Sequence, residues 1–464
     1  MWPSLARHLF LPAHEMLLLR PTLSIARRLA RDDGWTADAV ARYQADGRER
    51  LARHALAATA YWRGRAQRER IAPTGLDFPL LTRDEIARHR EAMRWPEAPG
   101  RLIRDTSSGT TDDSLVFYVD RERQAWDRAL RLHALARLGI EPGERQLHIW
   151  PEYTGGPFGR LKALLRATRD RFTNDPVFDL RPMTPERLDA ALAFLDRWRP
   201  AVVLGYPSWL HALAQRRLRH GRGGWTPRRV VTTAELLYDF QRRAIESAFG
   251  APVAEEYGSQ GVGLIAGEDG DRRWRVHWQQ VHVELLDAAG QPARPGEIGQ
   301  VVVTNLHSHA MPFIRFATGD VARAPSADDP AAPATMPRIA GRTADLVVAA
   351  DGRLQDNREL VDAVVRETGA TEFALHQPAP ERLVVLAADP DSGAGPARGP
   401  AVELLRSMLG RSLRVDWRVG AFLPTDSGKR RYVCSPVGQA LLAHDGEAAV
   451  ERSRGWPQRV FASV

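Results

Sequence analysis

The sequence predicts an α/β protein with a largely parallel sheet, a smaller β-rich part and a separate carboxy-terminal unit. Three observations support this fold class. Strand-like runs alternate with helical segments between residues 121 and 257, the pattern changes to strands and turns from Val281, and a second set of strands with a helix follows Gly341-Arg342. Strands that alternate with helices are typical of mostly parallel sheets covered by helices.

Residues 1–100 are predicted to form the helical beginning of a large domain. Apolar and basic residues recur there at helical spacing, and Thr82 with Glu85 three residues later predicts a capping box at a helix start. The leucine- and arginine-rich opening to Arg31 is predicted as a packed amphipathic helix. A helix that lies on a membrane surface stays open as the alternative.

Residues 101–340 are predicted to form the core of the large domain. Helices are expected at residues 121–138, 185–198, 211–219 and 238–249, and strands at 101–104, 115–119, 146–150, 201–207, 229–235 and 252–257. The β-rich part is expected from strands at 281–286, 299–304 and 313–316, and residues 324–337 are expected as a surface loop.

Residues 341–464 are predicted to form the carboxy-terminal domain. Strands are expected at 346–349 and 383–388 and a helix at 402–409, with a loop or linker at 389–400. These elements predict a smaller α+β unit.

The composition excludes several classes of protein. The chain has 464 residues, of which 44% are hydrophobic and 26% charged, as in globular proteins. It contains no apolar run long enough for a transmembrane span, and its amino terminus lacks a clean signal-peptide stretch, so we expect a cytoplasmic protein. The single cysteine, Cys434, excludes an internal disulfide and a cysteine metal cluster.

The net charge of +8 does not by itself indicate a nucleic-acid-binding protein. The arginines are scattered, usually beside acidic residues, and no basic run is interleaved with aromatic residues as a nucleic-acid groove would require. We therefore expect no nucleic-acid partner.

A loop rich in hydroxyl groups is the first candidate site. It lies between two strand-like runs and contains no bulky residue, so its backbone N–H groups and hydroxyls suit phosphate oxygens. A solvated hairpin loop is the competing interpretation. The residues of this loop are Thr106, Ser107, Ser108, Gly109, Thr110 and Thr111.

Further motifs place polar residues at predicted strand ends. Tyr257, followed by Gly258 and Ser259, puts an aromatic ring beside an exposed turn, where it stacks on a base or caps a core. Asp320 ends a strand-to-turn segment, where a carboxylate accepts two ribose hydroxyls or makes an Asx turn. Gly341-Arg342 and the loop that carries Lys429 complete the set.

Lys429 stands out because the chain has 65 basic residues and only two of them, Lys162 and Lys429, are lysines. A chain that uses arginine for nearly every cation would be expected to do so on ordinary surfaces. A retained lysine points to a tight site, where the guanidinium group cannot replace a compact ammonium group. Lys162 is interpreted as a surface residue.

Taken in order, these motifs resemble those of the adenylate-forming superfamily, and most closely the branch of phenylacetate–CoA ligases and capsule-biosynthesis (CapK-type) enzymes. The segments that carry the resemblance are Ser107 to Thr111, Tyr153 to Phe158, Gly205 to Ser208, Ala234-Glu235, Tyr257 to Ser259, Arg315 to Asp320, Gly341-Arg342 and Ser427 to Lys429. The resemblance covers nearly the whole chain, and it implies a mobile carboxy-terminal domain that rotates about residues 343–345.

The resemblance implies a role for each motif. Thr106 to Thr111 would hold the ATP phosphates, Tyr257 would stack on adenine, and Asp320 would bind the ribose. Arg342 would lie near the ribose or phosphates, and Lys429 would bridge the carboxylate and the α-phosphate. Glu235 and Gly258-Ser259 would complete the nucleotide site, and the acyl pocket would be lined by Tyr153, Thr154, Gly155, Gly156, Phe158, Tyr206 and Pro207.

Three departures from the family pattern concern charge. Asp112 and Asp113 follow the hydroxyl loop, and they repel a triphosphate unless a cation intervenes. Gly261 stands where the family has an acidic magnesium ligand, so Glu268 becomes the expected Mg²⁺ ligand.

The sequence therefore predicts an AMP-forming ligase that converts a carboxylic acid to an acyl-adenylate with ATP and transfers the acyl group to CoA. Transfer to an amine, a hydroxyl or a carrier protein is the alternative, and a ligand-binding scaffold without turnover is a third reading. The aromatic residues of the acyl pocket favour an apolar acid with a ring or a medium-length chain. A peripheral membrane contact and the choice between monomer and dimer stay open.

Overall fold

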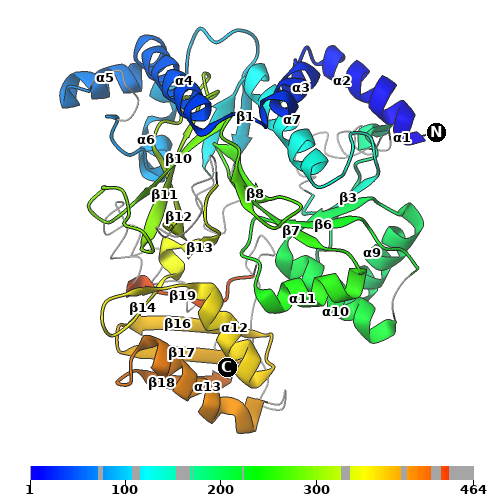
Figure 1. Ribbon diagram of the computed structural model, residues 1–464, viewed down its shortest axis with the longest axis vertical. Coiled ribbons are helices and arrows are strands. Elements are labelled where there is room, and N and C mark those ends of the chain that lie inside the picture. Colours follow the sequence, from blue (N-terminus) through cyan, green and yellow to red (C-terminus); the bar gives the residue numbers. More distant parts are fainter. Residues whose placement is uncertain are drawn as a thin grey trace.

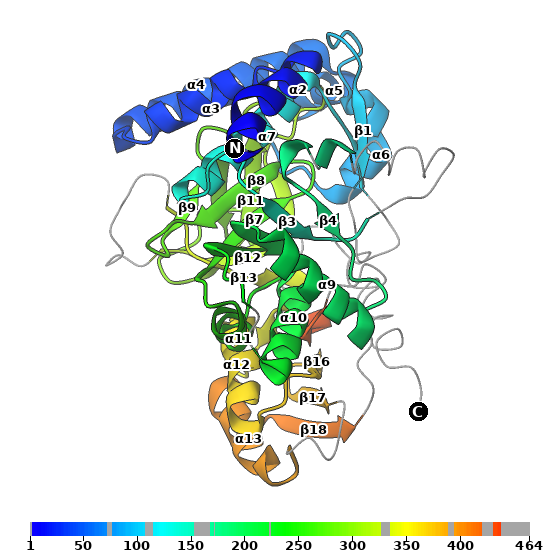
Figure 2. The same ribbon diagram turned by 90° about the vertical axis from the view of Figure 1, so that its right-hand side faces the viewer.

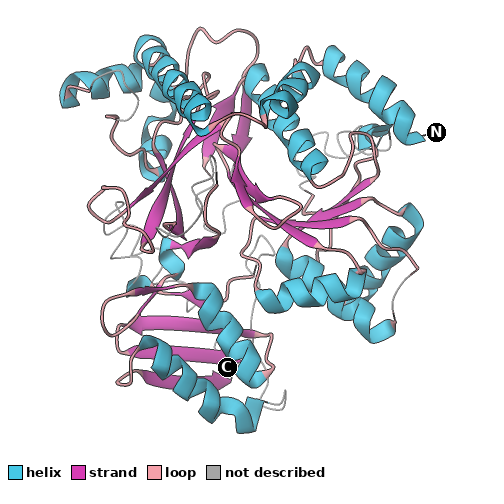
Figure 3. Cartoon of the chain, in the orientation of Figure 1, coloured by secondary structure: helices cyan, strands magenta, loops and turns pink. Residues whose placement is uncertain are grey.

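The computed structural model describes residues 2–71, 77–106, 115–152, 168–170, 172–221, 224–325, 335–387, 394–419 and 430–437. It shows a large part built on two sheets and a smaller carboxy-terminal part (Figures 1 and 3). The predicted α/β fold class is confirmed. Among the described residues, no helix has both the length and the apolar character needed to cross a bilayer.

The amino-terminal region is helical, as the sequence predicts, and Figure 2 shows its helices across the top of the molecule. Thr82 accepts a hydrogen bond from the N–H of Glu85, whose side chain returns one to the N–H of Thr82, so the predicted capping box is present. The helices are α1 (Trp2–Leu5), a π-helical turn (Ala6–Phe10), α2 (Leu11–Leu17), α3 (Thr22–Asp32), α4 (Ala37–Ala58), α5 (Ala60–Glu69) and α6 (Arg83–Met93).

A seven-stranded sheet forms the centre of the large part, in the order β4-β3-β5-β6-β7-β8-β9. Its first five strands are parallel, and β8 and β9 continue it in antiparallel fashion. The strands are β3 (Gln146–Ile149), β4 (Val177–Phe178), β5 (Val202–Gly205), β6 (Arg229–Thr233), β7 (Val253–Ser259), β8 (Gly263–Glu268) and β9 (Trp274–Val276).

Helices cover both faces of the parallel strands, which explains why these strands are apolar along their length. Alternate residues point to opposite faces. Val203, Val230 and Val253 pack with α9 (Pro185–Trp198), α10 (Pro207–His220) and α11 (Asp239–Phe249). Their neighbours Val202 and Val231 pack on the other face, where α7 (Arg121–Arg137) ends.

The predicted β-rich part is a four-stranded antiparallel sheet in the order β10-β11-β12-β13. The last predicted strand is displaced along the chain, because Phe313 and Ile314 are buried in the core outside the sheet and the strand begins at Phe316. The strands are β10 (Val281–Leu286), β11 (Ile298–Asn305), β12 (Phe316–Arg323) and β13 (Ile339–Arg342), and a separate two-stranded sheet consists of β1 (Ile103–Thr106) and β2 (Val116–Val119).

The carboxy-terminal part has a mixed sheet in the order β18-β17-β16-β19, and two helices pack with it (Figure 1). Its core includes Tyr238 and Phe240 from the large part, so the two parts share one apolar cluster at the start of α11. The elements are a 3₁₀ turn (Thr343–Asp345), β14 (Val347–Val348), β15 (Leu354–Gln355), α12 (Asn357–Thr368), β16 (Phe373–Ala379), β17 (Arg382–Ala387), α13 (Ala394–Leu409), β18 (Arg414–Val419) and β19 (Val433–Cys434).

Candidate functional site

One cavity of about 760 Å³ brings together most of the described site residues that the sequence predicts. It lies where the end of β7, the strands β12 and β13, the helix α7 and the carboxy-terminal segment at residues 430–433 meet. Its lining includes these predicted residues: Glu235, Tyr257, Gly258, Ser259, Asp320 and Arg342.

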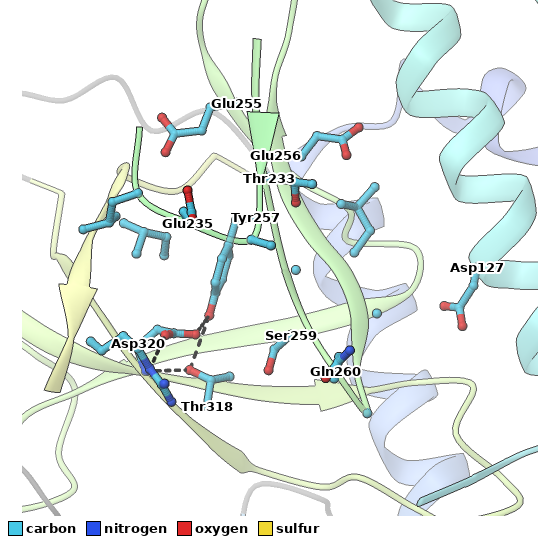
Figure 4. Close-up of a pocket in the computed structure, with 18 of the residues that line it drawn as sticks. Asp127, Thr233, Glu235, Glu255, Glu256, Tyr257, Ser259, Gln260, Thr318 and Asp320 are labelled. Atoms are coloured by element: carbon cyan, nitrogen blue, oxygen red, sulfur yellow. Dashed lines mark hydrogen bonds and ion pairs between the residues drawn. The ribbon is translucent and has the colours of Figure 1, made fainter. Parts of the chain in front are cut away.

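Tyr257 and Asp320 form the centre of this group (Figure 4). The Tyr257 hydroxyl donates a hydrogen bond to Asp320 Oδ2 at 2.9 Å and lies 3.3 Å from Thr318 Oγ1. Burial raises the pKa of Tyr257 well above its ordinary value, and the negative charge of Asp320 adds to the effect. The hydroxyl therefore stays protonated and holds the carboxylate in one orientation.

Asp320 faces Arg342 across two neighbouring strands. The two residues are direct partners in the antiparallel pairing of β12 with β13, and Arg342 Nε lies 3.6 Å from Asp320 Oδ1. Burial raises the pKa of Asp320, while the positive charge of Arg342 opposes that rise. The pair presents a fixed acceptor and a half-exposed cation at the same edge of the cavity.

Glycines shape the turn that follows Tyr257. A Cβ at Gly258 would lie 2.9 Å from the carbonyl oxygen of Gly263. At Gly261, φ is +94°, and a Cβ would lie 2.6 Å from the ring of Phe313. An acidic residue at position 261 would therefore strain the backbone and collide with the core. The absence of a carboxylate here has a structural cause in this chain.

Glu235 ties the cavity to the carboxy-terminal segment. Its carboxylate accepts hydrogen bonds from the N–H of Ser208 at 2.9 Å and from the Ser208 hydroxyl at 3.0 Å. It also accepts one from the backbone N–H of Arg430 at 2.8 Å. The residue that follows Lys429 is therefore held at the cavity, although Lys429 itself lies outside the described residues.

Glu268 does not fit the role of a magnesium ligand. Both of its carboxylate oxygens accept hydrogen bonds from Arg242, at 2.8 and 2.9 Å, and one also accepts the backbone N–H of Glu255 at 3.0 Å. It is not among the residues that line the cavity. Within the described ranges, no three acidic, histidine or cysteine side chains are grouped as metal ligands. Glu268 is therefore not placed to hold Mg²⁺ at this cavity.

The structure does not bring the two described acyl-pocket residues to the cavity. Tyr206 is fully buried, with its ring 4.4 Å from that of Trp150, and Pro207 begins α10. Both residues are buried where β5 runs into α10, and Tyr206 packs in the apolar cluster that the sheet forms with α9, α10 and α11. Thr106, at the exposed end of β1, is likewise absent from the cavity lining.

Several predicted residues lie outside the described residues. They are Ser107, Ser108, Gly109, Thr110 and Thr111 of the hydroxyl loop, Asp112 and Asp113 after it, Tyr153, Thr154, Gly155, Gly156 and Phe158 of the glycine-rich turn, and the two lysines.

The structure adds two groups of residues that the motifs did not indicate. One wall of the cavity is formed by α7, which contributes Arg123, Asp127 and Arg131. On a helix, such charges resemble an ordinary solvated face, so no sequence pattern singles these residues out. The second group is Glu255 and Glu256, and here the signal was present, since two acidic residues within an apolar strand are rarely buried without a partner.

Comparisons with known proteins agree with this arrangement. No family model matches the chain. The chain is 23% identical to the protein CapK of Staphylococcus aureus over 255 residues, which are 52% of each protein. It is 26% identical to the phenylacetate-coenzyme A ligase of Escherichia coli K12 over 290 residues, 58% of this chain and 62% of that enzyme. The matches thus span about half to three-fifths of these relatives.

Solved structures share the fold over more of the chain. A 2-hydroxyisobutyryl-CoA ligase matches with a TM-score of 0.66 and 17% identity, over 90% of this chain and 92% of that one. The amide bond synthetase McbA of Marinactinospora thermotolerans matches with a TM-score of 0.51 and 20% identity, over 75% and 69%. The sequence matches to CapK and the phenylacetate-coenzyme A ligase, together with the shared fold, indicate a relationship to the adenylate-forming superfamily.

Proposed function

We propose that this protein is an ATP-dependent ligase that activates a carboxylic acid as an acyl-adenylate, releases pyrophosphate and transfers the acyl group to CoA. The observation that carries the proposal is the arrangement of Tyr257, Asp320 and Arg342 around one cavity. A partly buried carboxylate with a fixed orientation suits two ribose hydroxyls, and the adjacent guanidinium suits a phosphate.

The chemistry requires positioning and charge stabilisation more than covalent participation by the protein. A carboxylate oxygen attacks the α-phosphorus of ATP, a P–O bond to it forms, and the bond to pyrophosphate breaks. Two anions must approach each other, so cations that face the developing charge lower the barrier. In this proposal Arg342 and Lys429 supply those cations, and Thr106 to Thr111 hold the phosphates.

The contact between Glu235 and the Arg430 backbone supports a catalytic position for Lys429. Arg430 lines the cavity, and the hydrogen bond fixes its amide at 2.8 Å from Glu235. Lys429 directly precedes Arg430 in the sequence. A compact ammonium group there can approach two oxygens at once.

CoA is the proposed acyl acceptor because relatives in sequence are named as coenzyme A ligases. An amine acceptor is the alternative, since one structural relative is an amide bond synthetase. In the CoA reaction, the thiol sulfur attacks the acyl carbon and AMP leaves. Measuring free thiol during turnover distinguishes the two acceptors, because only the reaction with CoA consumes it.

A second candidate function is a ligand-binding protein without turnover. It is favoured by Gly261, where Phe313 leaves no room for an acidic side chain, and by Glu268, which is engaged by Arg242. This candidate predicts ATP binding by calorimetry without acid-dependent pyrophosphate.

Acid-dependent pyrophosphate release tests the proposal. Purified protein is incubated with ATP and a panel of carboxylic acids, beside the variants Lys429→Ala and Lys162→Ala. We expect pyrophosphate with at least one acid, a loss of about 100-fold or more in Lys429→Ala, and little change in Lys162→Ala. Folded protein that binds ATP but releases no pyrophosphate with any acid would favour the second candidate.

A further inference from the structure

The cavity has a second end, away from Asp320, that the sequence motifs did not define. Its wall consists of α7 on one side and the β7–β8 turn on the other, and we call it the α7 end. Figure 4 shows Asp127 from α7 and Glu256 from β7 extending toward the space between the two elements, with Gln260 beside it. The α7 end is defined by Arg123, Asp127, Arg131, Glu256 and Gln260.

Glu256 is the buried carboxylate of this end. It precedes Tyr257 on β7, and its side chain points to the opposite side of the strand (Figure 4). The residue is 5% exposed, and Oε2 forms an ion pair with Arg131. Oε1 is buried and has no hydrogen-bond partner among the described residues. A buried carboxylate oxygen without a donor is costly, and native structures usually supply one.

Charged and polar side chains near Glu256 form hydrogen bonds with one another. Arg123 contacts both carboxylate oxygens of Asp127 at 3.0 Å and donates to the carbonyl of Gly261 at 3.1 Å. Gln280 donates to Asp127 Oδ1 at 2.6 Å. These bonds engage Nε and Nη1 of Arg123 and Nε2 of Gln280, and Glu256 Oε1 receives no donor from the described residues, although Glu256 lines the cavity.

This polar wall cannot easily rearrange to accept an apolar group. A Cβ at Gly263 would lie 2.6 Å from Asp127 Oδ1 and 2.9 Å from an Arg123 nitrogen, so the turn packs directly on the charged cluster. The side chain of Arg123 is only 3% exposed. To move these charged side chains away from an apolar ligand, the packing would have to open, and the hydrogen bonds just described would be lost.

We infer that the acid activated by this protein carries a hydrogen-bond donor, a hydroxyl or an ammonium group, which binds Glu256 Oε1 at the α7 end. The inference rests on the proposed adenylation and adds the class of acid. It differs from the sequence-based expectation of an apolar acid, which depended on Tyr206, a core residue, and on Tyr153 and Phe158, which lie outside the described residues. An acid without a donor leaves the Glu256 oxygen buried and unpaired.

Matched acids test this inference. Pyrophosphate release is measured with propionate, 3-hydroxypropionate and β-alanine, and with phenylacetate and 4-hydroxyphenylacetate. We expect kcat/KM to be about 10- to 100-fold higher for the better donor-bearing acid of a set than for its apolar partner, because a site built to hydrogen-bond a substrate rejects the analogue that lacks the group. Higher activity with the apolar acid in both sets would overturn the inference and leave the proposed adenylation intact.

Variants at Glu256 identify the residue and the donor. Glu256→Leu should abolish the preference. Glu256→Gln should retain it for a hydroxyl and lose it for an ammonium group, since only the latter needs the negative charge. Glu49→Gln, in the exposed ion pair of Glu49 with Arg53, is the matched control. A preference that persists in Glu256→Leu would contradict the assignment.

A double variant and the wild-type protein provide two further comparisons. If Glu256→Leu unfolds because Arg131 loses its partner, the double variant Arg131→Met/Glu256→Leu replaces the ion pair with apolar side chains, a change that is often tolerated. It should show the same loss of preference. No pyrophosphate with any acid from folded wild-type protein would contradict the proposed function and this inference together.

Discussion

Asp320 and Arg342 are cross-strand partners whose side chains meet at the cavity, with Arg342 Nε 3.6 Å from Asp320 Oδ1. The pairing of β12 with β13 fixes this relationship, so the position of the cation follows from the register of a sheet. Arg342 is also the last residue of β13, immediately before the 3₁₀ turn Thr343–Asp345 that leads into the carboxy-terminal part. The proposed nucleotide-binding pair and the connection between the two parts thus share one strand end.

Replacing Asp320 with asparagine is expected to separate ligand binding from stability. Burial raises the pKa of Asp320, so its native state binds a proton more readily than the unfolded chain does. The charged form therefore lowers stability at neutral pH, and that cost decreases as the pH falls. Asp320→Asn should unfold at an unchanged or higher temperature without ligand, yet lose most of the stabilisation by ATP. Differential scanning fluorimetry measures both quantities. An unchanged ATP-induced shift would contradict the ribose assignment.

Arg358 docks the carboxy-terminal part on the large part. It lies in α12 and donates to Glu255 Oε1 at 3.0 Å, to the Leu237 carbonyl at 2.8 Å and to the Ile339 carbonyl at 2.7 Å. Burial raises the pKa of Glu255, but Arg358 and Arg338 more than offset this, and the pKa is lowered. The stabilisation is therefore present above the ordinary glutamate pKa and is lost as the pH falls through the lowered value.

Arg358→Met is expected to destabilise the protein by about 3 kcal/mol, because the Ile339 carbonyl loses its donor, while Glu255 and the Leu237 carbonyl keep only Arg338 as a side-chain donor among the described residues. Urea denaturation at pH 7 measures the change. Arg366→Met is the matched control on the same helix, since Arg366 is exposed and its ion pair within the described part of the chain is with its neighbour Glu367. Equal effects of the two substitutions would show that the docking contact contributes no stability.

Asp362 caps a helix of the large part from within the carboxy-terminal part. Its carboxylate accepts the backbone N–H groups of Asp239 and Phe240, each at 3.3 Å, at the start of α11. Asp362→Ala should lower stability by about 1 kcal/mol, the usual cost of losing such a cap. Asp362→Asn keeps an acceptor and should recover most of that loss. Limited proteolysis near residue 350 should accelerate in the alanine variant only.

Buried histidines predict sensitivity to mild acid. Burial lowers the pKa of His277, His282 and His307 to about 3 each. Below the ordinary histidine pKa of about 6.5 the unfolded chain binds protons that the native state does not, so stability falls as the pH decreases. Three such groups should together cost about 3 kcal/mol between pH 7 and pH 5.5.

Urea denaturation at the two pH values checks this prediction, with His277→Leu expected to remove about a third of the pH dependence. The exposed His220, at the end of α10, is substituted by leucine as the control. Stability that does not change between pH 7 and pH 5.5 would contradict the assignment of these histidines as buried and neutral.

The sequence predicted most of the elements because local signals and burial agree along much of this chain. The α9 helix begins and ends where expected, and the Thr82 capping box is present, since a cap and an amphipathic pattern are both local. The start of β12 was misplaced because Phe313 and Ile314 have the apolar pattern of a strand but are buried in a connection. Hydrophobic periodicity indicates which residues are buried, but it does not distinguish a buried strand from a buried connection.

For a similar reason, some residues of the candidate site could be predicted from the sequence and others could not. Tyr257, Asp320 and Arg342 lie in ordered motifs, and the structure brings them to one cavity. The α7 end could not be predicted, because it depends on which face of a charged helix meets the β7–β8 turn. Glu268 was misjudged since its partner Arg242 lies 26 residues away and is not part of any motif.

ATP–pyrophosphate exchange tests the proposed adenylation by itself, because it detects reversible formation of an acyl-adenylate without any acyl acceptor. Wild-type protein is compared with Lys429→Arg, which preserves the charge but not the compact ammonium group. We predict exchange that requires a carboxylic acid in the wild type and falls by about 100-fold or more in Lys429→Arg. Exchange that is absent with every acid, although calorimetry shows that ATP binds, would contradict the claim.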